Sequence, residues 1–188
     1  MSRHVLPSIM SLAIAVITLT ACSSQVGGQA SPSASSPAAT RSTPTTADPS
    51  NPFAGMNPCT MLDQLLSGQG FPPAAPSLAD KKHACDTTRP VNDPKGSASI
   101  GLGLYPGQKV NENINNPAKA KPGTIDASGR PVVLQPEPLN SSGQCQINLQ
   151  VATNSRMDVL VTSGLDTERA CKMAGDLAEK VDPLLPKA

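Results

Sequence analysis

The chain has 188 residues, with 15 Lys and Arg against 14 Asp and Glu, and it contains no Trp, one Tyr and two Phe. The near-neutral charge and the lack of a basic stripe exclude a binding surface for nucleic acid. With so few aromatic residues, the core must consist of Leu, Ile, Val, Met and Ala, so covalent cross-links are expected to matter for stability.

Residues 1–21 have the parts of an export signal. Arg3 supplies the positive charge near the start, and residues 9–19 form an apolar stretch. That stretch is shorter than the roughly 20 apolar residues that a transmembrane helix needs. We therefore expect a signal peptide rather than a membrane-spanning anchor.

The segment Leu19-Thr20-Ala21-Cys22 closes the apolar stretch. It resembles the bacterial lipobox, in which an aliphatic residue and two small residues precede a cysteine. This resemblance implies a diacylglycerol thioether on Cys22, cleavage before that residue and usually an acyl chain such as palmitate on the new amino terminus. Two or three chains would give a stable lipid anchor at the cell membrane.

Residues 22–56 are predicted to be a disordered tether, because they are rich in Ser, Thr, Pro and Ala and poor in large apolar side chains. The tether would act as a spacer, and O-glycosylation of its Ser, Thr and Pro cluster is a further possibility. Residues 57–188 are then one small extracytoplasmic domain of ordinary size.

The first predicted element of the domain is a helix that starts at Asn57-Pro58. Asn57 has the character of an N-cap, and Pro58 suits the first helical position. We expect the helix to continue to Leu66 and to end at Gly68 or Gly70.

Strands are predicted downstream wherever apolar and polar residues alternate. The expected strands are 84–87, 98–104, 131–134, 144–151 and 157–161; residues 71–76 and 119–129 are expected as loops, and 110–114 as a helical turn or two. The strand 144–151 is predicted to be half-buried, with a polar outer face, and to form a hairpin with 157–161.

A second helix is predicted at the carboxyl end. Asp166 would cap it, an apolar face that includes Cys171 and Ala174 would bury it, and Pro183 would stop it. The sum is an α+β fold in which the N- and C-terminal helices pack on an antiparallel sheet.

Four cysteines remain once Cys22 is assigned to lipid, and an even number in an exported chain indicates two disulfides. They are Cys59, Cys85, Cys145 and Cys171. Three pairings are possible. We favour Cys59–Cys85 and Cys145–Cys171, because each joins elements that are neighbours in sequence.

No group of residues predicts catalysis, a cofactor or a metal. His83 is the only histidine outside the leader, and its neighbours Lys82 and Cys85 indicate a surface residue. Gly101-Leu102-Gly103 lacks the third glycine and the helix of a dinucleotide-binding loop, so it is interpreted as plain strand. Asp80 and Asp86 could contribute to a carboxylate site, but so could any other two acidic residues of the chain.

The layout resembles an actinobacterial lipoprotein family, the domain of unknown function 3558 family. The motifs that carry this resemblance are the lipobox, the tether, Asn57–Leu62, Ala84-Cys85-Asp86, Ser141–Ile147 and Ala170–Ala178. The resemblance implies an exported, lipid-anchored α+β domain, and it brings no activity or active site.

Three functions are compatible with these features. The first is a non-enzymatic binding or interaction module at the extracytoplasmic face of the cell membrane, with an envelope protein, lipid or glycan as its partner. The alternative is a carrier or sensor for lipid or cell-wall fragments, with an apolar pocket between the sheet and the helices. The third is an envelope hydrolase that depends on His83.

Overall fold

The structure is a computed structural model that describes residues 51–90, 92 and 96–187. The predicted signal peptide 1–21, Cys22 and most of the tether 22–56 lie outside the described residues. The elements of the described part, in chain order, are α1 (Pro58–Leu66), β1 (Ala75–Pro76), β2 (Ala84–Arg89), β3 (Ala98–Pro106), the 3-10 turn η1 (Val110–Asn113), β4 (Lys121–Thr124), β5 (Pro131–Pro136), β6 (Gln144–Ala152), β7 (Ser155–Thr162), α2 (Thr167–Val181) and the 3-10 turn η2 (Asp182–Leu184).

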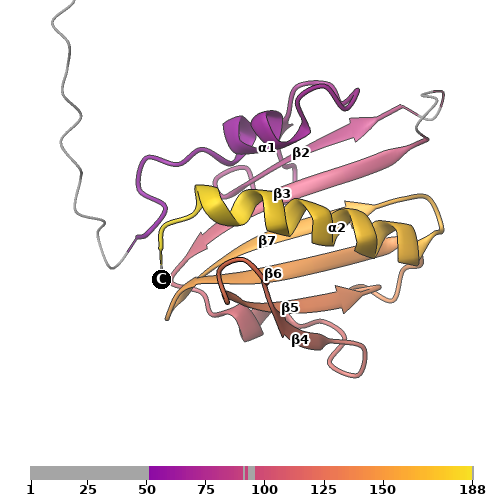
Figure 1. Ribbon diagram of the computed structural model, residues 1–188. Coiled ribbons are helices and arrows are strands. Elements are labelled where there is room, and N and C mark those ends of the chain that lie inside the picture. Colours follow the sequence, from indigo (N-terminus) through magenta and orange to yellow (C-terminus); the bar gives the residue numbers. More distant parts are fainter. Residues whose placement is uncertain (1–50, 91, 93–95, 188) are drawn as a thin grey trace, which may run out of the picture. The chain divides into compact units, whose positions relative to one another are not determined.

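The strands form one antiparallel sheet in the order β1-β2-β3-β7-β6-β5-β4. Strands β3 and β7, which are far apart in the sequence, pair at its centre. Figure 1 shows α2 lying across one face of this sheet, with α1 beside it over β2 and β3. The predicted α+β fold, with both helices on an antiparallel sheet, is confirmed.

Helix α1 begins as the sequence predicts. The side chain of Asn57 accepts hydrogen bonds from the backbone N–H groups of Cys59 at 2.9 Å and Thr60 at 3.2 Å, which satisfies two donors that the first helical turn leaves free. The helix buries Leu62 and Leu66 against the sheet.

Helix α2 is capped by Asp166, whose carboxylate accepts from the backbone N–H of Arg169 at 2.9 Å. Its buried face is made largely of alanine, including Ala170 and Ala174, and these short side chains let the helix lie close to β6 and β7. Pro183 follows the end of the helix, within the turn η2, as predicted.

The hydrophobic core fills the layer between the helices and the sheet. Its largest fully buried aliphatic side chains are Leu62, Ile100, Leu102, Leu149, Met157, Val151, Val159, Val161 and Val181. Phe53, which belongs to the segment predicted as tether, is only 5% exposed and packs into this core. Burial of its aromatic ring offsets the entropy lost when that short segment becomes ordered.

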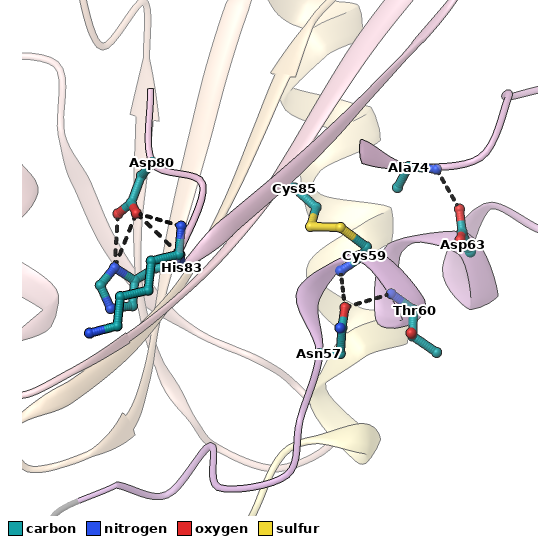
Figure 2. The surroundings of a disulfide bond; sticks show 9 residues. Asn57, Cys59, Thr60, Asp63, Ala74, Asp80, His83 and Cys85 are labelled. Carbon is teal, nitrogen blue, oxygen red and sulfur yellow. Dashed lines mark hydrogen bonds and ion pairs between the residues drawn. A yellow bond between two sulfur atoms is a disulfide. The ribbon is translucent and has the colours of Figure 1, made fainter. Parts of the chain in front are cut away.

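Both predicted disulfides are present. Cys59–Cys85 ties α1 to β2, with the two Cα atoms 5.0 Å apart, and Cys145–Cys171 ties β6 to α2, with 4.9 Å between the Cα atoms. The first of these bonds is drawn in Figure 2. Each helix is therefore attached covalently to the sheet that it covers.

Two segments predicted as loops contain strands. Residues 121–124 form the edge strand β4, and residues 75–76 form the short strand β1 at the opposite edge. All of these residues are exposed, so neither strand carries the apolar alternation that marks a buried face. Their neighbours β5 and β2 impose the strand conformation through backbone hydrogen bonds.

The strand β6 differs from its prediction on one face. Two of its polar side chains are buried: Gln146 is 7% exposed and Asn148 is fully covered. Because β3 lies at the centre of the sheet and β4 at the edge, the connection 107–120 has to cross β7, β6 and β5. The helices occupy the other face, so this connection covers the polar one.

Candidate functional site

The candidate site lies on the face of the sheet opposite the helices, which we call the polar face. Adjacent strands align their side chains in rows on this face. One row runs Asp86, Gly101, Leu160, Gln146 across β2, β3, β7 and β6, and the next runs Ala84, Gly103, Asp158, Asn148 across the same strands. These rows decide which side chains meet.

The connection 107–120 is held to the polar face by buried amides. The Asn148 Nδ2 donates to the carbonyl oxygens of Val110 at 3.2 Å and Asn113 at 3.4 Å. Gln135, also fully buried, donates to the carbonyl of Asn113 at 2.9 Å and accepts from the backbone N–H of Asn115 at 3.1 Å. Because buried amides must be paired, this connection is held in one position.

A buried ion pair lies in the first half of β7. The Arg156 Nε donates to the Asp158 carboxylate at 2.9 and 3.1 Å, and the Asn113 Nδ2 donates to the same carboxylate at 3.1 Å. Both charged side chains are more than nine-tenths buried. Burial raises the pKa of Asp158 to about 6, because it outweighs the opposing effects of Arg156 and Asn113.

Tyr105 lies flat over β3 beside this pair. The Arg156 guanidinium carbon is 4.6 Å from the centre of the Tyr105 ring, a cation–π contact. A side chain at Gly103 would place its Cβ 2.8 Å from the ring carbon that carries the hydroxyl, so only glycine lets the ring lie there. Burial, followed by the charge of Asp158, raises the pKa of Tyr105 above its ordinary value.

A cavity of about 270 Å³ opens beside Tyr105, over β3. Gly101 leaves its floor without a side chain, since a Cβ there would find only ordinary contacts, at 3.8 Å or beyond. Leu160 and Gln146 form one wall, and Asp86 with the loop 77–80 forms the other. The cavity thus combines an apolar floor with carboxylate, amide and phenol groups.

Asp80 and Asp86, the acidic pair noted in the sequence, both line this cavity. Figure 2 shows Asp80 beside His83 just before β2; its carboxylate accepts from the backbone N–H of His83 at 3.1 Å and lies 3.1 Å from the Nδ1 of that ring. His83 is half-buried and lines a second cavity of about 260 Å³, together with Phe53, Met56 and Leu104. Gly101-Leu102-Gly103 lies within β3, as predicted.

Asp158, Arg156, Tyr105 and Gln146 are site residues that the sequence reasoning missed. Arg156 and Asp158 are charged residues two apart on a strand that otherwise reads as apolar and central. Charges at those positions of a central strand need a buried partner, and this signal could have identified them. Gly101 and Gly103 of β3 are evident in the sequence, but the sequence does not give the strand register that places them opposite Leu160 and Asp158.

Among residues 51–90, 92 and 96–187, no group of three His, Cys, Asp or Glu side chains is arranged to hold a metal ion. In that same part of the chain, neither helix has the length and apolar character needed to cross a membrane.

Comparison with known proteins places the chain in one family. The model of a family described as "Protein of unknown function (DUF3558)" matches residues 17–184. No curated protein and no solved structure matches the chain. The matched range begins two residues before the predicted lipobox, ends at the last residue of η2 and contains every residue of the candidate site.

Proposed function

Since this chain belongs to the DUF3558 family of proteins of unknown function, we propose its function from the polar-face cavity and the amino-terminal sequence. It is a non-enzymatic binding module of the cell envelope, held at the extracytoplasmic face of the membrane by a lipid on Cys22. The polar-face cavity is its binding site.

The observation that carries this proposal is the rigid construction of the cavity. Its wall contains Asp158, whose carboxylate is held by Arg156 and Asn113. The Cys59–Cys85 disulfide attaches the opposite wall, β2, to α1. Polar groups held in place before a ligand arrives lose little entropy on binding, which is what a binding site requires.

The membrane anchor is supported by the sequence and by the disulfides. The lipobox Leu19-Thr20-Ala21-Cys22 ends an apolar stretch of signal-peptide length. Disulfides persist in oxidising compartments outside the cytoplasm, and this chain pairs all four cysteines of its domain.

The anchor is tested with the variant Cys22→Ala and the matched control Ser23→Ala. The wild type and the control should enter the detergent phase on partitioning, and their amino-terminal peptide should carry a diacylglycerol thioether by mass spectrometry. Cys22→Ala should remain an uncleaved precursor. A cleaved Cys22→Ala protein that still enters the detergent phase would show that the anchor lies elsewhere.

The binding site is tested by filling the cavity. Gly101→Leu places a side chain into it, whereas Gly123→Leu makes the same change on the exposed edge strand β4. After incubation with an envelope extract, native mass spectrometry should find a bound small molecule on the wild type and on Gly123→Leu but not on Gly101→Leu. A bound mass that Gly101→Leu leaves unchanged would place binding outside this cavity.

A second candidate is a carrier of lipid or cell-wall fragments. The layer between sheet and helices, where an apolar pocket was expected, is filled by core side chains. The second cavity favours this candidate, because Phe53, Met56 and Leu104 add apolar groups to a lining that also holds Lys82 and His83. If lipid binds in this cavity, native mass spectrometry should show a higher mass for the wild type after incubation with lipid extract. The variant Met56→Arg should not show this increase.

A further inference from the structure

The orientation of Gln146 in the cavity wall is set by a chain of hydrogen bonds. Asn148 donates its Nδ2 to two backbone carbonyl oxygens, of Val110 and Asn113, so its Oδ1 must be an acceptor. Gln146 donates its Nε2 to that oxygen at 2.8 Å. Its own Oε1 is therefore the atom left over for another partner.

Gln146 is 93% buried, yet no donor among the described residues reaches its Oε1. This oxygen is also not shut off from the cavity, since the fully enclosed unpaired side-chain atoms of the described residues are the Gln144 Oε1 and the Ser163 Oγ. A buried carbonyl oxygen without a donor costs free energy. It is suited to accept a hydrogen bond from a ligand in the cavity.

The charged side chains that line the cavity are all acidic in the part of the chain that the structure describes. Asp80, Asp86 and Asp158 line it, and none of the described residues that line it is a lysine or arginine. Asp158 is paired with Arg156, and Asp80 is hydrogen-bonded to His83. Lys82 is exposed on the loop beside His83. Asp86 is half-buried and has no ion-pair partner among the described residues, so its carboxylate is available to a cation.

Asp86 and Gln146 are the two ends of one row across the sheet, with Gly101 and Leu160 between them. Adjacent strands are about 4.8 Å apart, so the row spans about 14 Å between backbones. Both polar side chains line the cavity, and the two residues between them, Gly101 and Leu160, add no polar side chain to it. A ligand that fits needs a positive group at one end, a hydrogen-bond donor at the other and C–H groups in between.

We propose that the cavity binds a small ligand of the amino-sugar class, with its ammonium group on Asp86 and a hydroxyl donating to Gln146. The proposal rests on the binding function proposed above and adds the chemical class of the ligand. A cavity of about 270 Å³ lies just below the range of drug-sized pockets, which suits a molecule of about one sugar ring. The C–H groups of the ring would lie on Leu160.

The test compares glucosamine with glucose, which differ by an ammonium group in place of a hydroxyl. The full lipid-anchored protein is titrated in detergent micelles at pH 7, and the backbone amide resonances of Gly101, Leu160 and Asn113 are followed by NMR. Glucosamine should shift them in a saturable way, with an affinity at least about tenfold above that of glucose, because a charge-assisted hydrogen bond is lost with glucose.

Two variants assign the interaction. Asp86→Asn keeps the shape of the side chain and removes its charge, so it should weaken glucosamine about tenfold and leave glucose unchanged. Asp126→Asn, at an exposed aspartate in the β4–β5 loop, is its matched control. Gly101→Leu should abolish the shifts, whereas Gly123→Leu should not.

Equal affinities for the two sugars, or shifts that persist in Gly101→Leu, would overturn the assignment. So would the absence of any saturable shift with glucosamine. These results leave the proposed binding function standing if the envelope extract still supplies a ligand that Gly101→Leu excludes. If the wild type binds no small molecule from the envelope extract, the proposed binding function itself is wrong.

Discussion

The buried Asp158 makes the stability of this fold depend on pH in a specific direction. An exposed aspartate has a pKa of 3.8, whereas burial raises that of Asp158 to about 6. The folded state therefore binds a proton more tightly than the unfolded chain does. The stability that Asp158 contributes is complete below pH 3.8 and is lost as the pH rises through about 6.

The size of the effect follows from the two pKa values. Their difference corresponds to about 3 kcal/mol of unfolding free energy, since one pKa unit is about 1.4 kcal/mol. Asp158→Asn cannot titrate. The unfolding free energy of the wild type minus that of Asp158→Asn should therefore fall by about 3 kcal/mol between pH 3.5 and pH 7.

Urea unfolding of both proteins, with disulfides intact, at several pH values measures this difference. Other titrating groups cancel in the comparison, so the change belongs to position 158. Asp126→Asn, at an exposed site, controls for the loss of one carboxylate. A difference that stays constant or grows with pH would refute the reasoning, because it would mean that Arg156 and Asn113 balance or outweigh the burial of the carboxylate.

Two further predictions concern the frame around the site. The two disulfides have the same sequence separation, 26 residues, so replacing either pair by alanine should cost about 3.5 kcal/mol in the chain-entropy model. Urea unfolding of the two paired variants measures this, and a loss near zero for either pair contradicts it. Gly143→Ala should destabilise by more than 2 kcal/mol, because φ is +80° and a Cβ would overlap the carbonyl oxygen of Gly164. Gly129→Ala shares the positive φ but meets nothing within 4 Å, so its thermal unfolding should show a smaller loss, and equal losses would rule out the overlap.

Most of the architecture could be predicted because its signals are local. Alternation of apolar residues predicts β3, β6 and β7, and the capping residues Asn57 and Asp166 predict where the two helices begin. Strand β4 could not be predicted, because its residues are all exposed and its conformation depends on pairing with β5. Edge strands of this kind carry no signal of their own.

The candidate site was only partly accessible to prediction. The sequence shows that Asp86 is acidic and that Gly101 is small, but nothing in it places them in register with Leu160 and Gln146. The polar side of β6 was expected to face solvent. Whether a polar residue is exposed or buried depends on what lies above it, and here that is the connection 107–120.

By itself, the sequence determined the helix starts, the main strands, the favoured disulfide pairing and the α+β class, since each depends on residues close together in the chain. It also carries the prediction that Cys22 is the lipid-bearing residue. Only the tertiary structure decided that a cavity lies on the polar face. Pairing of β3 with β7 brings Asp86, Gly101 and Gln146 into one row, and the position of β4 at the edge forces the chain across that face. Both are long-range consequences of strand order, which no local pattern encodes.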